Sequence, residues 1–177
     1  MKITEIKGGV TAAKGFEAAA AAAAIKYQGR TDMALVYSEK PCHAAGTFTT
    51  NIVKAAPVKW DQKIVKESPY AQAVIVNSGI ANACTGEAGY AQSVATAETV
   101  AGLIGAEPND VAVCSTGLIG ELLPLDNVLA GAKSAHEALA ATAEAGTDAS
   151  HAIMTTDTKP KTVELTGSNG WKIGGMV

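Results

Sequence analysis

The chain has 177 residues, of which 47% are hydrophobic and 18% charged, and its formal net charge is −3 at pH 7. This length supports one domain with a hydrophobic core, and the composition is that of a globular protein. Because the net charge is negative and the basic residues are scattered singly along the sequence, the sequence argues against a nucleic-acid partner.

The sequence also argues against a membrane or an oxidising compartment. The longest unbroken apolar run, residues 18–25, has eight residues, whereas a bilayer-spanning helix needs about 20. No charged leader with an apolar core and a cleavage site is present at the N-terminus. Cys42, Cys84 and Cys114 are odd in number and widely spaced, so we expect small buried thiols, no metal site and a cytoplasmic location.

In the first half of the chain, strand and helix patterns alternate. The alanine tract at 18–24 could form a helix by propensity, although Gly15 and Gly29 flank it. The remaining predictions for this half are strands at 33–38 and 47–53 and a short helix at 57–68.

In the second half, residues 73–77 and 111–115 are continuous apolar runs that predict buried strands, and the apolar spacing between them predicts a helix at 89–105. Together they predict a βαβ unit and an α/β or α+β fold. A second long helix is expected at 126–146, capped by Asp126 and ended by Gly146. The chain then closes with a predicted hairpin at 162–166 and 171–175.

We find no linker-like stretch and no repeat, so residues 1–177 are expected to form a single domain. The final residues, 171–177, are apolar and glycine-rich with no polar tail. We therefore expect the natural polypeptide to continue beyond them and this domain to be incomplete alone.

Three segments place hydroxyls, amides and glycines directly after apolar runs, namely NSGIANACTG (77–86), STGLIG (115–120) and TTDTKPK (155–161). Each alone is an ordinary turn, but ligands favour loops at strand ends. A serine-hydrolase elbow and phosphate-binding loops are missing from the sequence. The hydroxyl of Thr116 beside Gly117 is instead suited to hold an oxyanion, although no credible nucleophile accompanies it.

These segments resemble the ornithine acetyltransferase (glutamate N-acetyltransferase) family of arginine biosynthesis. The opening KGFEAAAAAAAIKYQGRTDMALVYSE, the segment PCHAAGTFTTNIVKAAPV and the loop VNSGIANACTG are similar to that family's sequence in the same order. CSTGLIGELLP is similar to its STGVIG segment, and IMTTDTKPK to its TTDT motif. The likeness runs from about residue 7 to the last residue, and the set of motifs is highly specific.

The resemblance implies a precursor that cleaves itself before a threonine to give an α chain and a β chain, which assemble as an α2β2 heterotetramer. The new N-terminal threonine of the β chain would take acetyl from N-acetylornithine and pass it to glutamate without a cofactor. Thr116 and Gly117 match the family's oxyanion hole. Thr156 matches its α-chain substrate contact, with Thr155 as the close competitor. The implied fold is a layered α/β sandwich completed by the β chain.

Two alternatives stay open from the residues. One is the α chain of a self-cleaving aminopeptidase of the same superfamily, and the other is a non-catalytic binding domain. Acetyl-CoA stays open as a further acetyl donor. Ile80 stands where the family usually has asparagine, which removes an amide from the segment at 77–86 and weakens the case that this segment contacts substrate.

Overall fold

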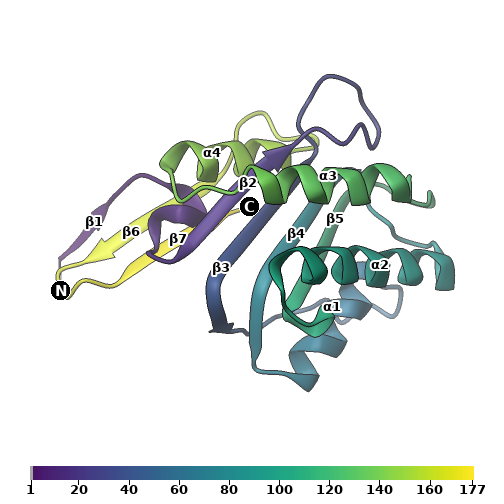
Figure 1. The fold of residues 1–177 in the computed structure, drawn as a ribbon, viewed down its shortest axis with the longest axis horizontal. Coiled ribbons are helices and arrows are strands. Elements are labelled where there is room, and N and C mark those ends of the chain that lie inside the picture. The colour runs from purple at the N-terminus through teal and green to yellow at the C-terminus, as the bar shows by residue number, and fades with distance from the viewer. Residues whose placement is uncertain (1) are drawn as a thin grey trace.

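The computed structural model describes residues 2–177, which form two β-sheets and four α-helices in a mixed α/β fold, as predicted. The larger sheet has the order β2-β3-β4-β5, and its strands are β2 (Phe16–Ala21), β3 (Met33–His43), β4 (Tyr70–Ile80) and β5 (Val111–Leu118). The smaller sheet has the order β1-β6-β7, with β1 (Ile3–Glu5), β6 (Thr162–Gly167) and β7 (Lys172–Met176). Figure 1 shows the smaller sheet extending from one end of the molecule, where the N-terminus lies.

The predicted βαβ unit is confirmed. Strands β4 and β5 are parallel, and α2 (Gly86–Ile104) connects them together with the short 3-10 helix η2 (Pro108–Asp110). α2 ends where Gly105 adopts a left-handed conformation with φ 71°, which glycine enters without steric cost. Because parallel strands end on the same side, the unit brings two polar segments together at one edge of the sheet.

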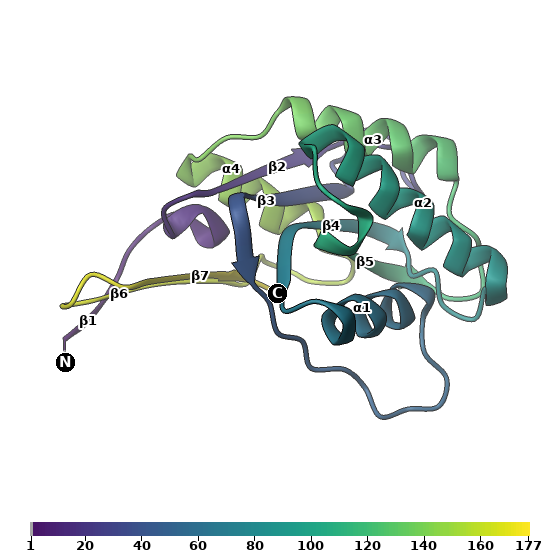
Figure 2. The same cartoon turned by 60° about the horizontal axis from the view of Figure 1, so that its bottom comes forward.

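Helices cover both faces of the larger sheet. Helices α1 (Ala56–Glu67), α2 and α3 (Leu125–Glu137) enclose the main core on one face. Figure 2 shows α2 and α3 side by side. α4 (Ala143–Ala152) packs on the opposite face against small side chains of β2 and β3. Helices therefore cover both faces only at β2 and β3. In β4 and β5 buried residues alternate with half-buried ones, so the continuous apolar runs at 73–77 and 111–115 are not covered by helices on both faces.

The first four residues of the alanine tract belong to strand β2 and residues 22–24 have no regular secondary structure, so the prediction of a helix at 18–24 is wrong. Residues Phe16–Ala21 pair antiparallel with β3 along their whole length. Ala18 belongs to the cluster under α4, whereas Ala19 belongs to the core under α1 to α3. Alternation of alanines lets helices pack closely on both faces of this strand, and that packing outweighs the high helix propensity of alanine.

The prediction of a strand at 47–53 is also wrong. Residues 44–55 have no regular secondary structure, and Ile52 is 96% exposed. Local side chains take the backbone donors instead, since Asn51 N–H donates to Thr49 Oγ1 at 3.1 Å and Val53 N–H donates to Asn51 Oδ1 at 2.9 Å. Such local bonds compete with strand pairing.

The helix predicted at 126–146 is two helices, α3 and α4. Between them Ala140 makes a bridge to β2, with backbone hydrogen bonds of 3.1 Å in both directions to Ala18. Asp126 lies in the first turn of α3 without capping it. Gly146 does not end a helix but lies inside α4. Glycine is needed there because a Cβ would lie 2.1 Å from the Gly8 carbonyl oxygen.

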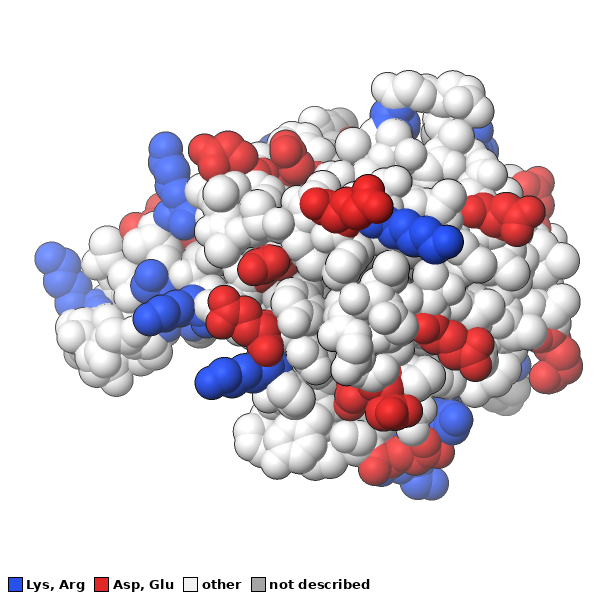
Figure 3. Space-filling view, in the orientation of Figure 1, with Lys and Arg blue, Asp and Glu red and all other residues white. Residues whose placement is uncertain are grey.

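Charged residues of both signs are dispersed over the surface, and Figure 3 shows Asp and Glu interspersed with Lys and Arg on one face. Among residues 2–177, no helix has the length and apolar character that crossing a membrane requires.

Candidate functional site

The polar segments at 77–80 and 115–118 lie inside strands rather than in loops after them. Asn77 pairs in register with Ser115, Ser78 with Thr116, and Gly79 with Gly117, at the carboxyl ends of β4 and β5. This end of a parallel strand pair is a common place for ligand sites in α/β folds. The strands are longer than predicted, so these residues are the ends of strands and not the loops that the sequence predicted.

At this edge the two strands approach so closely that only glycine fits. A Cβ on Gly117 would lie 2.3 Å from the carbonyl carbon and 2.4 Å from the carbonyl oxygen of Gly79. Gly117 also has φ 131°, which side-chain-bearing residues rarely adopt. The backbone at Gly117 is therefore bare and exposed next to the half-buried Thr116.

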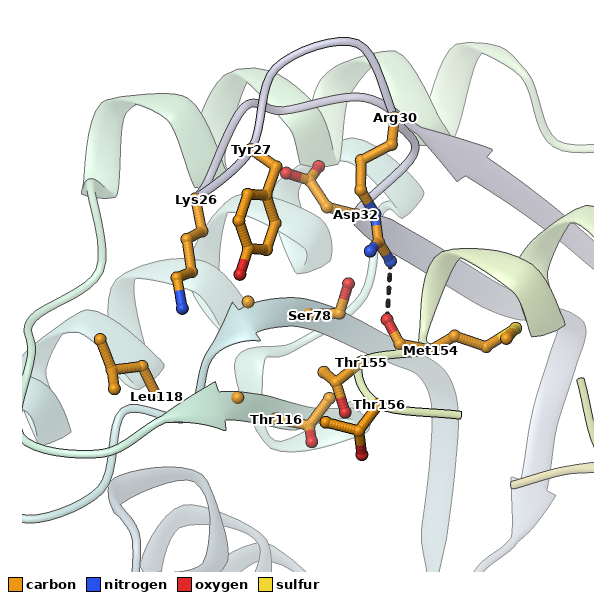
Figure 4. A pocket seen from close by; sticks show the side chains of 12 residues that line it. Lys26, Tyr27, Arg30, Asp32, Ser78, Thr116, Leu118, Met154, Thr155 and Thr156 are labelled. Carbon is orange, nitrogen blue, oxygen red and sulfur yellow. Dashed lines mark hydrogen bonds between the residues drawn. The ribbon is translucent and has the colours of Figure 1, made fainter. Parts of the chain in front are cut away.

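A cavity of about 400 Å³ opens at these strand ends. All four candidate site residues line it, with Thr116 and Gly117 coming from β5 and Thr155 and Thr156 from the segment after α4. Figure 4 shows the three threonines on one side of the cavity and Lys26, Tyr27 and Arg30 reaching in from the other. The remaining lining residues are Asp32, Ser78, Gly79, Leu118 and Met154.

The residues that sequence reasoning missed lie in the connection between β2 and β3. Lys26, Tyr27 and Arg30 come from the stretch KYQGR, where two cations and an aromatic ring surround a glycine after an apolar run. That combination was the available signal. Asp32, 3% exposed, holds this connection in place, because its carboxylate accepts hydrogen bonds of 2.7 Å from the N–H groups of Ala23 and Ile25.

The segment that carries Thr155 and Thr156 follows a helix, not the strand end that its apolar run suggested. Two hydrogen bonds attach it to the rest of the cavity. Arg30 Nη2 donates to the Met154 carbonyl at 2.6 Å, and the buried Ser78 hydroxyl donates to the Ala152 carbonyl at 2.7 Å. These bonds connect both carbonyls at the end of α4 to the β2–β3 connection and to β4.

Most of the segment at 77–86 supports the fold rather than the cavity. The Asn77 side chain donates to the Ile80 carbonyl at 2.8 Å and accepts from the Ser115 hydroxyl at 2.6 Å. Asn82, fully buried, donates to the Gly89 carbonyl at 2.8 Å. Ile80 is 5% exposed and packs in the main core. The departure from the family pattern at Ile80 therefore falls on a packing position and leaves the cavity lining unchanged.

Asp61 in α1 and Cys114 in β5 are not part of the cavity lining, and the pKa of each is raised strongly. Burial raises the pKa of Asp61 to about 6, against the lowering effect of its 2.9 Å hydrogen bond from Val113 N–H. Burial, followed by the charge of Asp61, raises the pKa of the Cys114 thiol to about 12. A thiol in this state stays protonated at neutral pH and is not a nucleophile.

The described residues form no cluster of metal ligands. Across residues 2–177, His, Cys, Asp and Glu side chains do not gather in threes around a possible metal position. The chemistry that the cavity offers consists of hydroxyl and backbone donors on one side and two cations on the other, a set suited to polar ligands that carry negative charge.

Comparison with known proteins finds curated relatives of this chain. The chain is 78% identical over 170 residues to the arginine biosynthesis bifunctional protein ArgJ of Bifidobacterium longum, and 52% identical over 174 residues to that of Mycobacterium leprae. These matches cover 95% of this chain but only 43% and 42% of the relatives. The chain thus spans less than half the length of these curated relatives.

Two solved structures have the same fold. The ornithine acetyltransferase of Mycobacterium tuberculosis, solved in complex with ornithine, is 48% identical, with a TM-score of 0.95 over 99% of this chain and 94% of that one. ArgJ of Bacillus halodurans is 35% identical, with a TM-score of 0.92 over 99% of this chain and 93% of that one. The ArgJ family itself matches residues 17–177. The chain belongs to the ArgJ family.

Proposed function

We propose that this chain is the α chain of an ornithine acetyltransferase that moves acetyl from N2-acetylornithine to glutamate. The observation that carries the proposal is the cavity at the ends of β4 and β5, where Thr116 and Gly117 lie together with Thr155 and Thr156. Family membership and the likeness to an ornithine acetyltransferase solved with ornithine support the same substrates. They favour this reading over an aminopeptidase or a non-catalytic binding domain.

In the proposed reaction, the N-terminal threonine of a separate β chain attacks the acetyl carbonyl of N2-acetylornithine. Its own α-amine, with an ordinary pKa near 8, takes the hydroxyl proton. The carbonyl oxygen becomes an oxyanion, which accepts hydrogen bonds from the Thr116 hydroxyl and the Gly117 N–H. Collapse of this intermediate breaks the amide C–N bond, releases ornithine with the proton and leaves acetyl-threonine.

In the second half of the proposed reaction, an amine is the nucleophile and the threonine is the leaving group. The amine of glutamate attacks the acetyl-threonine carbonyl, and the same two donors hold the second oxyanion. Collapse returns the threonine hydroxyl and releases N-acetylglutamate. Because both intermediates place negative charge at one position, a single preorganised pair of donors serves both steps. Thr156, with Thr155 as the competitor, would bind polar groups of the substrate.

We further propose that residues 1–177 form one domain completed by the β chain, in a layered α/β sandwich that assembles as α2β2. The coverage of 43% of the Bifidobacterium longum relative leaves room for a second chain of similar size. Exposed apolar side chains on the smaller sheet, Val163 at 46% and Ile173 at 51%, support contact with further polypeptide. Burial of such a surface is favourable.

The test uses the complete protein, with both chains, and N2-acetylornithine labelled in its acetyl group. We expect labelled acetyl to appear on glutamate and, when glutamate is withheld, on an N-terminal threonine detected by mass spectrometry. Release of labelled acetate regardless of glutamate would favour the hydrolase alternative. Absence of any acetyl-enzyme would contradict the proposal.

A further inference from the structure

Two cations line the cavity, Lys26 and Arg30, and the described residues give neither of them an ion-pair partner. Arg30, the other cation of the lining, donates to the Met154 carbonyl. Asp32, the acid of the lining, is buried and turns both carboxylate oxygens to backbone N–H groups. Among the described residues, Lys26 is therefore the charged side chain of the lining whose polar group has no hydrogen-bond partner, so its ammonium is free to bind an anion.

Lys26 is held in this place by its backbone and its neighbours. The hydrogen bond from Ile25 N–H to Asp32 fixes the residue directly before it. Its stem passes over the end of β4, where a Cβ on Gly79 would lie 3.0 Å from the Lys26 Cβ. Its Nζ lies 5.1 Å from the centroid of the Tyr27 ring, within the range of a cation–π contact. In Figure 4 the ammonium extends to the mouth of the cavity near Leu118.

We propose that Lys26 is a substrate-binding residue that recognises the α-carboxylate of the amino-acid ligand. This inference rests on the proposed function and names one contact within it. The side chain of the acetyl donor, N2-acetylornithine, ends in an ammonium, and the side chain of the acetyl acceptor, glutamate, ends in a carboxylate. The two ligands therefore differ in charge at their side-chain ends. Their α-carboxylate is the anionic group that both share. A lysine that contacts the ligand in both half-reactions must therefore lie at the α-carboxylate. At the side-chain end of the ligand, the lysine would repel the ammonium of ornithine.

The experiment uses the processed two-chain enzyme and two donors, N2-acetylornithine and its α-carboxamide, which lacks the negative charge. Lys26→Met keeps most of the stem and removes the charge, and Lys26→Arg restores a cation. Lys133→Met, an exposed lysine on α3, is the matched control. We expect Lys26→Met to raise KM for N2-acetylornithine about 10-fold or more, the scale of a lost charged hydrogen bond.

For the carboxamide, Lys26→Met should leave KM unchanged, and kcat should change little for both donors. Lys26→Arg should recover much of the lost affinity, and Lys133→Met should behave as the wild type. An equal rise in KM for acid and amide would overturn the assignment, because the lysine would then act through structure. So would an unchanged KM for N2-acetylornithine.

A binding measurement separates this inference from the proposed function. Calorimetric titration with ornithine and ornithinamide needs no acetyl transfer. If the wild type binds ornithine more tightly than ornithinamide and Lys26→Met loses that preference, the contact between Lys26 and the α-carboxylate is supported, even if the enzyme does not transfer acetyl. If wild type and variant show the same preference, the contact is refuted while the acetyltransferase proposal is untouched.

Discussion

Gly79 and Gly117 face each other at the ends of β4 and β5, with no space for a side chain between them. We predict that Gly117→Ala destabilises the protein and abolishes acetyl transfer, because the new Cβ would lie 2.3 Å from the Gly79 carbonyl carbon. Thermal unfolding and turnover of the complete enzyme would measure both effects.

Gly102→Ala is the control for this substitution. Gly102 lies in α2, and a Cβ there meets nothing within 4 Å. Alanine should therefore stabilise the protein by about 1 kcal/mol through helix propensity and leave turnover unchanged. Equal stability of the Gly117→Ala and Gly102→Ala enzymes would contradict the close approach of the two strands.

Thr116→Ala should lower the rate of acetylation by about 10²–10³ with little effect on KM, as expected when one oxyanion donor is lost. Pre-steady-state release of ornithine measures this step directly. Thr116→Ser, which keeps the hydroxyl, should retain most of the rate. If a correctly cleaved Thr116→Ala enzyme turns over like the wild type, Thr116 is not an oxyanion donor.

Thr156→Val should raise KM by the equivalent of about 1–3 kcal/mol, because a polar group of the substrate would lose its partner. Folding should be intact, since Thr156 is exposed. Thr155→Val is the paired variant, with the same change of shape one residue away. If Thr155→Val alone raises KM, the substrate contact belongs to Thr155.

Arg30 is predicted to be a positioning residue that acts through the segment after α4. Arg30→Gln removes the 2.6 Å hydrogen bond to the Met154 carbonyl, so residues 154–157 should exchange their amide hydrogens faster. KM should rise while the stability of the sheet stays unchanged. Unaltered exchange in this segment would show that the hydrogen bond does not hold it.

Asp61 predicts a pH dependence of stability. Its pKa is raised from its usual 3.8 to about 6 by burial, so between these pH values the folded state holds a proton that the unfolded state has lost. The contribution of Asp61 to the free energy of unfolding should therefore rise as pH falls from about 7 to about 4, and decline as pH rises through 6.

Asp61→Asn isolates this effect from that of other carboxylates. The amide oxygen can still accept the Val113 N–H, and the buried charge is gone. The variant should be more stable than wild type at pH 7.5, with the difference shrinking towards pH 4.5 in denaturant titrations. A difference that stays constant with pH would contradict the raised pKa.

The hydrophobic pattern of a short segment correctly predicted the strands and helices whose conformation depends on that segment alone. Residues 73–77 and 111–115 read as strands because they are short apolar runs rich in valine and isoleucine, and 89–105 reads as a helix because one side packs and the other is solvated. The errors at 18–24 and 126–146 arise where a distant contact decides the conformation. The bridge between Ala18 and Ala140 joins both segments.

The sequence by itself determined the family resemblance, the mixed α/β class and four threonine and glycine residues that prove to line one cavity. These follow from motif identity and hydrophobic periodicity, which are local properties of the chain. Tertiary structure alone decided that Lys26, Arg30 and Asp32 join that cavity and that Ile80 does not. The reason is physical: side chains distant in sequence meet only through sheet register and helix packing, which no single segment encodes.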